Sequence, residues 1–262
     1  MSRTFPRRTT FCALMLAAVC MAVAGCARIP GRPGAGPEVV RPEQVLEFPA
    51  LYKQNCAACH GENGSNGAAI SLANPVYIAV AEGNHLRDVV ANGVPGKLMP
   101  AFAKSAGGML TDGQVSALAQ GIVKQWGNPN LLAGQNPPPY RSALPGNAEN
   151  GLQAYQVFCA RCHGANGEGG PADGIANSSK GKLGSIVDPS YLALISDQNL
   201  RSITIAGRPD EEMPDWRNDA AQPMPAKPMP MNPMTDRQIT DILAWLASKR
   251  VANPGQPYPT HP

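Results

Sequence analysis

The chain has 262 residues, including 27 glycines and 27 prolines, and a formal charge of +3 at pH 7. Its length allows one or two domains, and its glycine and proline content predicts long loops and modest regular structure. Arg3, Arg7 and Arg8 lie in the first 25 residues, which contain no acid, so a chain beginning at Cys26 has 19 basic and 19 acidic residues. This neutral balance argues against a nucleic-acid-binding protein and provides no global positive field to attract an acidic partner.

Residues 1–25 have the features of an export signal. Residues 1–8 are basic, and residues 11–24 form an apolar run that is too short to span a bilayer comfortably. The run ends in Val23-Ala24-Gly25-Cys26, which resembles the lipobox of bacterial lipoproteins; the resemblance implies a lipidated Cys26 on the periplasmic side of a bacterial membrane. An ordinary signal peptide and a retained helical anchor are the alternatives. Residues 26–43 are predicted to be a flexible tether.

Two pentapeptides have the pattern C-x-x-C-H, which is the signature of covalent haem attachment. Two thiols on one helical turn can each form a thioether with a haem vinyl group, and the adjacent histidine then meets the iron. A redox dithiol and half a zinc site are alternative interpretations of C-x-x-C, disfavoured by the trailing histidine and by the lack of another suitably spaced cysteine pair. We therefore predict two covalently attached haem c groups. The residues concerned are Cys56, Cys59, His60, Cys159, Cys162 and His163.

The chain is an internal duplication. At a shift of 114, residues 74–102 align with residues 188–216 without a gap, and the pair Met99-Pro100 falls on Met213-Pro214. The haem motifs are related by a shift of 103, and the segments that begin at Thr111 and Thr235 by a shift of 124. The second copy therefore contains insertions after its motif and after its Met-Pro pair.

Each copy is predicted to be a set of helices joined by loops, with no convincing strand pattern. N-cap and proline signals place helix starts at Asn74-Pro75, Asp188-Pro189, Thr111 and Thr235. Further helices are expected over residues 44–54, 148–158, 85–91 and 198–206. Three consecutive prolines in residues 127–146 favour a semi-rigid linker, and residues 251–262 form a C-terminal tail.

The order helix, C-x-x-C-H, loop, Met-Pro-x-aromatic and closing helix resembles class I cytochrome c in each half, and the chain is similar to the di-haem members of that family. The resemblance implies an all-α fold with cytochrome c domains at residues 44–126 and 147–250, each wrapped around a haem, and a closing helix that crosses the first helix. It also implies an iron ligand pair in each domain. These pairs are His60 with Met99, and His163 with Met213.

Physical arguments support the methionine ligands. A thioether opposite an imidazole raises a haem's reduction potential, and the prolines that follow bias Met99 and Met213 towards the extended geometry of a loop ligand. The alternative is that these methionines fill the core. His85 is a competing ligand, but its repeat partner is Asn199, so we expect a solvated helix residue. Residues 223–234 are interpreted as a surface loop, with a soft-metal site as the alternative.

Some side chains outside the predicted ligands also recur. We expect core packing for the aromatic residues and a solvated face for the arginines, with contact to the haem or a propionate as the alternative. The pairs are Tyr77 and Tyr191, Arg87 and Arg201, and Phe102 and Trp216.

One feature departs from the family pattern. The second domain has the usual glycine eight positions before its first motif cysteine, Gly151, and its closing helix has Trp245. In the first domain, Phe48 stands where the second domain has Gly151, and Gly121 stands where it has Trp245. We predict a large-for-small exchange across the same helix crossing.

Electron transfer is the leading functional hypothesis. Two six-coordinate irons have no open site for a substrate, so we expect an electron carrier rather than an enzyme, tethered to a membrane in a respiratory or photosynthetic chain. A second hypothesis makes the protein a fixed subunit of a quinol-oxidising complex, a terminal oxidase or a periplasmic dehydrogenase. A di-haem peroxidase is a remote third, because it needs a vacant or displaceable ligand position. The partners expected are redox proteins and, under the second hypothesis, a membrane-bound oxidoreductase complex.

Overall fold

The computed structural model describes residues 40–81, 83–171, 182–217 and 232–252. The chain divides into two compact units, Met1–Pro42 and Glu43–Pro262, and the second contains both haem motifs. Cys26 and residues 223–231 of the tract at residues 223–234 lie outside the described ranges. Every helix within these ranges is too short or too polar to cross a bilayer.

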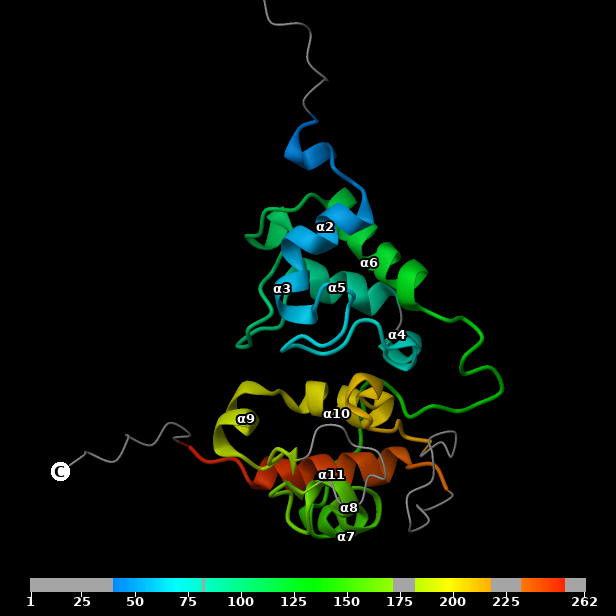
Figure 1. Cartoon of the computed structure of the whole chain (residues 1–262), viewed down its shortest axis with the longest axis vertical. Coiled ribbons are helices and arrows are strands. Elements are labelled where there is room, and N and C mark those ends of the chain that lie inside the picture. The colour runs from blue at the N-terminus through cyan, green and yellow to red at the C-terminus, as the bar shows by residue number, and fades with distance from the viewer. Residues whose placement is uncertain (1–39, 82, 172–181, 218–231, 253–262) are drawn as a thin grey trace, which may run out of the picture. The chain divides into compact units, whose positions relative to one another are not determined.

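The two halves of the second unit have the same order of α-helices (Figure 1). The first half contains η2 (Pro42–Gln44), α2 (Phe48–Asn55), α3 (Ala57–His60), α4 (Pro75–Ala81), α5 (Gly83–Asn92), η3 (Lys104–Ala106) and α6 (Asp112–Trp126). The second contains α7 (Ala148–Phe158), α8 (Ala160–His163), α9 (Pro189–Leu194), α10 (Asp197–Ala206), η4 (Pro209–Glu211) and α11 (Asp236–Ser248). The predicted all-α class is confirmed. A two-residue ladder, β1 (Gly170–Pro171) against β2 (Lys182–Leu183), lies in the insertion of the second copy and was not predicted.

Side-chain caps fix the predicted helix starts. The Asn74 side-chain oxygen accepts hydrogen bonds from the backbone N–H groups of the second and third residues of α4, at 3.0 and 3.1 Å. Asp188 does the same for α9, at 2.9 and 3.0 Å. Thr111 and Thr235 each form a capping box with a glutamine three residues later. The first helix is the exception: it begins at Phe48 rather than at residue 44, with a proline in its first turn.

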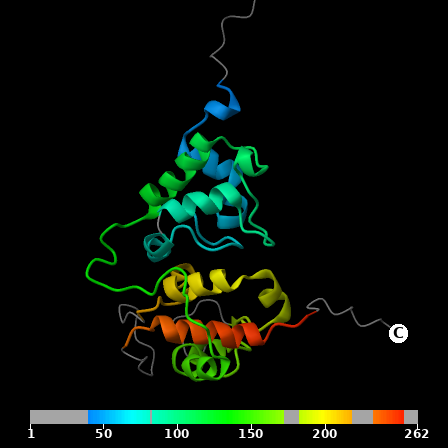
Figure 2. The ribbon, with the colours of Figure 1, turned by 180° about the vertical axis from the view of Figure 1, so that it is seen from behind.

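The closing helix of each half packs against the first helix, as predicted: α6 against α2, and α11 against α7 (Figure 2). A Cβ atom built on Gly121 would lie 2.1 Å from Cδ2 of Phe48, so the phenyl ring occupies the space above that glycine. A Cβ atom on Gly151 would lie 2.0 Å from the main-chain oxygen of Asp241 and 2.9 Å from Cβ of Trp245. The predicted exchange of large and small residues is confirmed.

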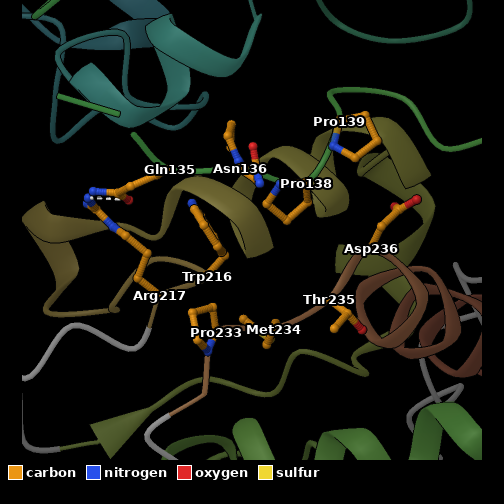
Figure 3. Close-up of a pocket in the computed structure, with 11 residues that line it drawn as sticks. Gln135, Asn136, Pro138, Pro139, Trp216, Arg217, Pro233, Met234, Thr235 and Asp236 are labelled. Carbon is orange, nitrogen blue, oxygen red and sulfur yellow. Dashed lines mark hydrogen bonds between the residues drawn. The ribbon is translucent and has the colours of Figure 1, made fainter. Parts of the chain in front are cut away.

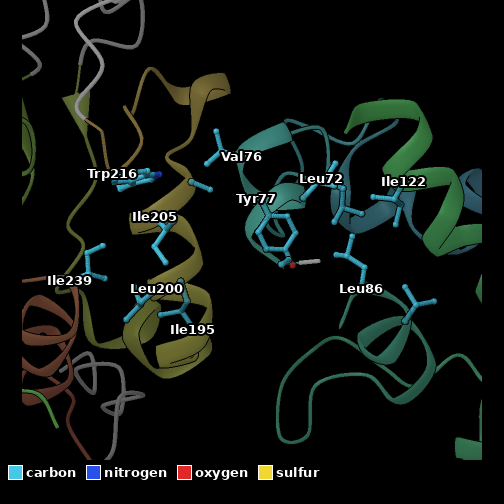
Figure 4. Packing of buried hydrophobic residues seen from close by; sticks show 14 of the residues in the cluster. Leu72, Val76, Tyr77, Leu86, Ile122, Ile195, Leu200, Ile205, Trp216 and Ile239 are labelled. Carbon is cyan, nitrogen blue, oxygen red and sulfur yellow. The ribbon is translucent and has the colours of Figure 1, made fainter. Parts of the chain in front are cut away.

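The buried apolar side chains form one cluster through the second unit (Figure 4). In the second half, Ile205, Ile239 and Trp216 gather around α10. In the first half, Leu86 and Ile122 pack between α5 and α6. This packing holds the short motif helices α3 and α8 at the end of α2 and α7.

Candidate haem sites

The first motif is a single helical turn that directly follows α2. Cys56 ends α2 by donating its N–H to the oxygen of Tyr52 at 2.8 Å, and His60 donates its own N–H to the oxygen of Cys56 at 2.9 Å. The second motif has the same turn, because Cys159 donates to Tyr155 at 2.8 Å and His163 donates to Cys159 at 3.0 Å. The backbone thus presents two thiols and an imidazole from one turn in both halves.

The four motif cysteines form no disulfide. Burial, followed by the neighbouring Cys59, raises the pKa of Cys56 to about 11. Burial, followed by Cys162, raises the pKa of Cys159 to about 12. A redox dithiol needs a thiolate with a lowered pKa, so these environments argue against that interpretation of the motifs.

The His60 ring is held in the tautomer that binds a metal. Its side chain is buried, and its Nδ1 lies 2.7 Å from the main-chain oxygen of Ile70. A carbonyl oxygen only accepts hydrogen bonds, so Nδ1 carries the proton and Nε2 keeps its lone pair. Burial lowers the pKa of His60, although the bond to Ile70 opposes this effect. A neutral imidazole with a bare Nε2 fits the fifth ligand of a haem iron.

The imidazole of His163 differs from that of His60 in the hydrogen bonding of Nδ1. Nδ1 of His163 is buried and has no hydrogen-bond partner within the described ranges. Ser71 and Ser185 occupy equivalent places, since each donates its hydroxyl to a backbone oxygen of the loop after the motif, Gly64 at 3.0 Å and Gly167 at 3.1 Å. The main-chain oxygen of Gly184, which precedes Ser185, therefore corresponds to that of Ile70. It forms no hydrogen bond with Nδ1 of His163. Burial lowers the pKa of His163 as well.

A tyrosine four residues before each first motif cysteine supports the end of the motif turn. The Tyr52 hydroxyl donates to the oxygen of Gly61 at 2.8 Å, and the Tyr155 hydroxyl donates to the oxygen of Gly164 at 2.6 Å. Both glycines have φ near +80°, a conformation that favours glycine. Sequence reasoning missed these tyrosines, although aligning the two motifs at a shift of 103 would have shown them.

The two Met-Pro loops leave the third helix of each half in the same way. Gly93 and Gly207 follow α5 and α10 with φ of 67° and 66°, and a Cβ atom on either would lie 2.6 Å from the main-chain oxygen of the methionine. The next residue donates its N–H to that methionine oxygen, at 3.0 Å for Met99 and 2.9 Å for Met213. Glycine is needed because the backbone of the Met-Pro pair passes directly over it. Both methionines are half-buried.

Several recurring side chains have roles other than those expected. Arg201 is buried rather than solvated, and it donates to Pro139 O in the linker, at 2.7 Å, and to the carboxylate of Asp236. Arg87 donates to the Ser116 hydroxyl at 3.3 Å. The expectation of a solvated His85 is wrong, because its half-buried ring packs on the Tyr140 ring with centroids 4.3 Å apart.

The linker also borders a cavity of about 710 Å³ in the second half (Figure 3). Pro138 and Pro139 lie on one side of it, and Trp216, Met234 and Asp236 lie on the other. The predicted iron ligands and motif cysteines do not line this cavity.

Comparisons with known proteins identify both halves. Residues 148–249 match the family model of cytochrome c, and residues 43–120 match that of the cbb3-type cytochrome c oxidase subunit III. Each half of the chain thus matches a model of a c-type cytochrome domain. Cytochrome c domains hold haem c covalently through C-x-x-C-H turns such as those described above. Both matches support the predicted class of electron carrier.

Curated relatives of the cytochrome are oxidase subunits. The chain is 27% identical over 154 residues to the cbb3-type cytochrome c oxidase subunit CcoP of Azospirillum sp. (strain B510), covering 53% of this chain and 47% of the relative. It is 26% identical over 156 residues to subunit FixP of Sinorhizobium medicae (strain WSM419), with the same coverage. The chain thus spans about half the length of these relatives.

A structural likeness to a chain of the Kuenenia stuttgartiensis reducing HAO-like protein complex covers 82% of this chain and 99% of that chain. Its TM-score of 0.42 and identity of 15% are too low to support any functional argument.

Proposed function

We propose that this cytochrome binds two haem c groups and passes electrons as the c-type subunit of a membrane oxidase. Both halves present two thiols and an imidazole from the same turn, and this duplicated turn is the observation that carries the proposal. The names of the relatives, which are subunits of cbb3-type oxidases, favour the fixed-subunit form of the predicted function over a free shuttle.

In this proposal His60 and Met99 ligate one iron, and His163 and Met213 ligate the other. A bound haem c supplies a one-electron iron couple. The protein's part is to hold the imidazole with its bare Nε2 in place: in the first half Ile70 accepts the Nδ1 proton, and Tyr52 fixes the residue after the histidine. Gly93 and Gly207 allow the loop to turn back and deliver the methionine.

Membrane attachment is proposed to occur through lipidated Cys26, on the periplasmic side of a bacterial membrane. The lipobox-like end of the export signal supports this, and several acyl chains on one residue anchor a protein durably. A Cys26→Ser variant should appear in the soluble periplasmic fraction, whereas the wild-type chain should stay with membranes. A variant that remains membrane-bound would contradict the lipid anchor.

Haem counting and co-purification test the proposal. The full-length cytochrome should contain two haems per chain by pyridine haemochrome assay and intact mass. In a mild detergent it should co-purify with cytochrome c oxidase activity, and a redox titration should show two low-spin haems. A chain with one haem would overturn the di-haem assignment. A di-haem cytochrome that leaves the membrane alone would support the free shuttle.

A further inference from the structure

The two cytochrome domains meet where the start of α4 lies against the end of α10. Asn74 is almost completely buried at this contact, with 2% of its surface exposed. Its oxygen caps α4, while its Nδ2 donates to the main-chain oxygens of Ala206 at 2.9 Å and Gly207 at 3.2 Å. These carbonyls lie at the C-terminal end of α10, where helices leave acceptors unpaired. One amide therefore caps a helix in the first domain and closes a helix in the second.

Asp188, the repeat partner of Asn74, shows that the bonds to α10 need an amide and the helix cap does not. Asp188 caps α9 with the same geometry, but it is exposed and makes no bond across the domain contact among the described residues. A carboxylate is therefore sufficient for the cap. At position 74 a carboxylate would have no N–H to donate, and its charge would face the negative end of the α10 dipole in a buried place.

Apolar and linker contacts surround this amide. Val76 and Tyr77 on α4 are buried, and Figure 4 shows Val76 directed towards α10. Burial, followed by the neighbouring Tyr140, raises the pKa of Tyr77 above its usual range. Tyr140 belongs to the linker, and its main-chain oxygen is fixed to α10 by the amide of Gln198 at 2.8 Å. The contact thus joins α4, the linker and α10.

Two polar bonds lie further out along the same contact. The ammonium group of Lys97, two residues before Met99, donates to the main-chain oxygen of Ala193 at 3.2 Å. The N–H of Asn66, in the loop after the first haem motif, points at the carboxylate of Asp210 at 3.4 Å. The loops that flank the two predicted haem sites are therefore tied to the opposite domain.

We propose that Asn74 is a positioning residue that holds the two domains in one fixed arrangement, so that an electron passes between the two haem sites without domain diffusion. This inference rests on the proposed di-haem function. Linked domains move relative to each other by default unless their interface prevents it. The amide of Asn74 favours the docked arrangement, because its two hydrogen bonds to α10 form only there and undocking replaces them with bonds to water.

The test is Asn74→Asp in the full-length holoprotein, with Asp188→Asn as the matched control. Asn74→Asp keeps the cap, removes the donors across the interface and places a negative charge at the C-terminal end of α10. It should shift the docked equilibrium towards undocked domains by roughly ten- to a hundredfold. Electron equilibration between the haems after light-triggered reduction should slow in proportion to the loss of docked molecules, and calorimetry should show the domains unfolding separately. Asp188→Asn should change neither result.

A second variant, Asn74→Ser, keeps a cap without adding charge and carries the test if Asn74→Asp loses haem. An equilibration rate and unfolding profile like those of the wild-type protein, in a variant that still holds two haems, would overturn the proposed role of Asn74. The haem count separates this result from failure of the proposed function, which would instead show as fewer than two haems in the wild-type chain.

Discussion

At the helix crossing of the first half, Phe48 fills the space above Gly121, whereas in the second half Trp245 passes over Gly151. Both arrangements place a tryptophan on the motif tyrosine: Trp126 lies 5.1 Å from Tyr52, and Trp245 lies 4.3 Å from Tyr155, centroid to centroid. The two tryptophans come from different positions on their closing helices. The crossing has thus been packed in two ways, while the tyrosine it supports is unchanged.

Most of the features proposed to hold the haem are the same in both halves, and the exception is the bond at Nδ1 of the motif histidine. The motif turn, the tyrosine bond to the following glycine, and the glycine beneath the Met-Pro loop have the same geometry in both halves. Backbone hydrogen bonds and positive φ angles allow few substitutes, whereas apolar volume can be redistributed between two facing helices. The comparison therefore separates contacts that hold the cofactor from contacts that only fill space.

Removing the thiols of one half at a time tests whether both turns are equivalent in haem attachment. Cys56→Ser with Cys59→Ser should leave one haem, in the second half, because a hydroxyl does not form the thioether. Cys159→Ser with Cys162→Ser should leave one haem in the first half. Intact mass and peptide mapping measure the result. Two haems in either double variant, or none in both, would contradict the attachment of one haem at each motif turn.

Alanine at the two crossing glycines should reveal how each crossing is packed. Gly121→Ala places its Cβ against the Phe48 ring, and Gly151→Ala places it against the backbone oxygen of Asp241. Each change should lower the free energy of unfolding by about 1–3 kcal/mol, measured by denaturant titration.

Truncating the facing aromatic residue distinguishes the two clashes. Phe48→Ala combined with Gly121→Ala should cost clearly less than the sum of the single changes, because the ring that clashes has been removed. Trp245→Ala should not relieve Gly151→Ala, because the clashing backbone oxygen and Cβ remain. Additive effects in the first pair would contradict the packing described here.

Local signals predicted much of this fold. The caps at Asn74, Asp188, Thr111 and Thr235 depend on residues within three positions, so the sequence shows both partners. The facing of Phe48 and Gly121 was predicted from the glycine that the resembled family usually has before its motif, together with the comparison of the two copies. The late start of α2 was missed because Glu47 remains extended before a proline in the first turn.

The remaining contacts join residues that are far apart in the chain. Arg201 is buried because its acceptors are Pro139, about sixty positions earlier, and Asp236 on the closing helix. His85 packs on Tyr140 for a similar reason, and the second role of Asn74 depends on α10 of the other domain. Helical periodicity and capping rules contain no information on such pairs, so sequence reasoning predicted the separate domains better than their contact.

The capping boxes should contribute equally in the two halves. Thr111→Ala and Thr235→Ala each remove the acceptor for a backbone N–H at 3.2 Å, so each should lower the free energy of unfolding by about 1 kcal/mol. Serine at either place should restore most of the loss. A large difference between the two variants would show that one closing helix depends less on its cap than the other.

The smallest effect expected is that of the motif tyrosines, and its pH dependence identifies the bond responsible. Tyr52→Phe removes a hydroxyl bonded to a backbone oxygen and should lower the free energy of unfolding by about 0.5–1.5 kcal/mol. Burial, followed by Cys56, raises the pKa of Tyr52 from 10.0 to about 12, and burial remains when the thiol becomes a thioether. A raised pKa means that the folded state holds the proton more tightly. The advantage of the wild-type protein over Tyr52→Phe should therefore be constant below pH 10 and decline as the pH rises towards 12. A difference that does not change over this window, measured by denaturant titration at each pH, would show that the hydroxyl is not the group responsible.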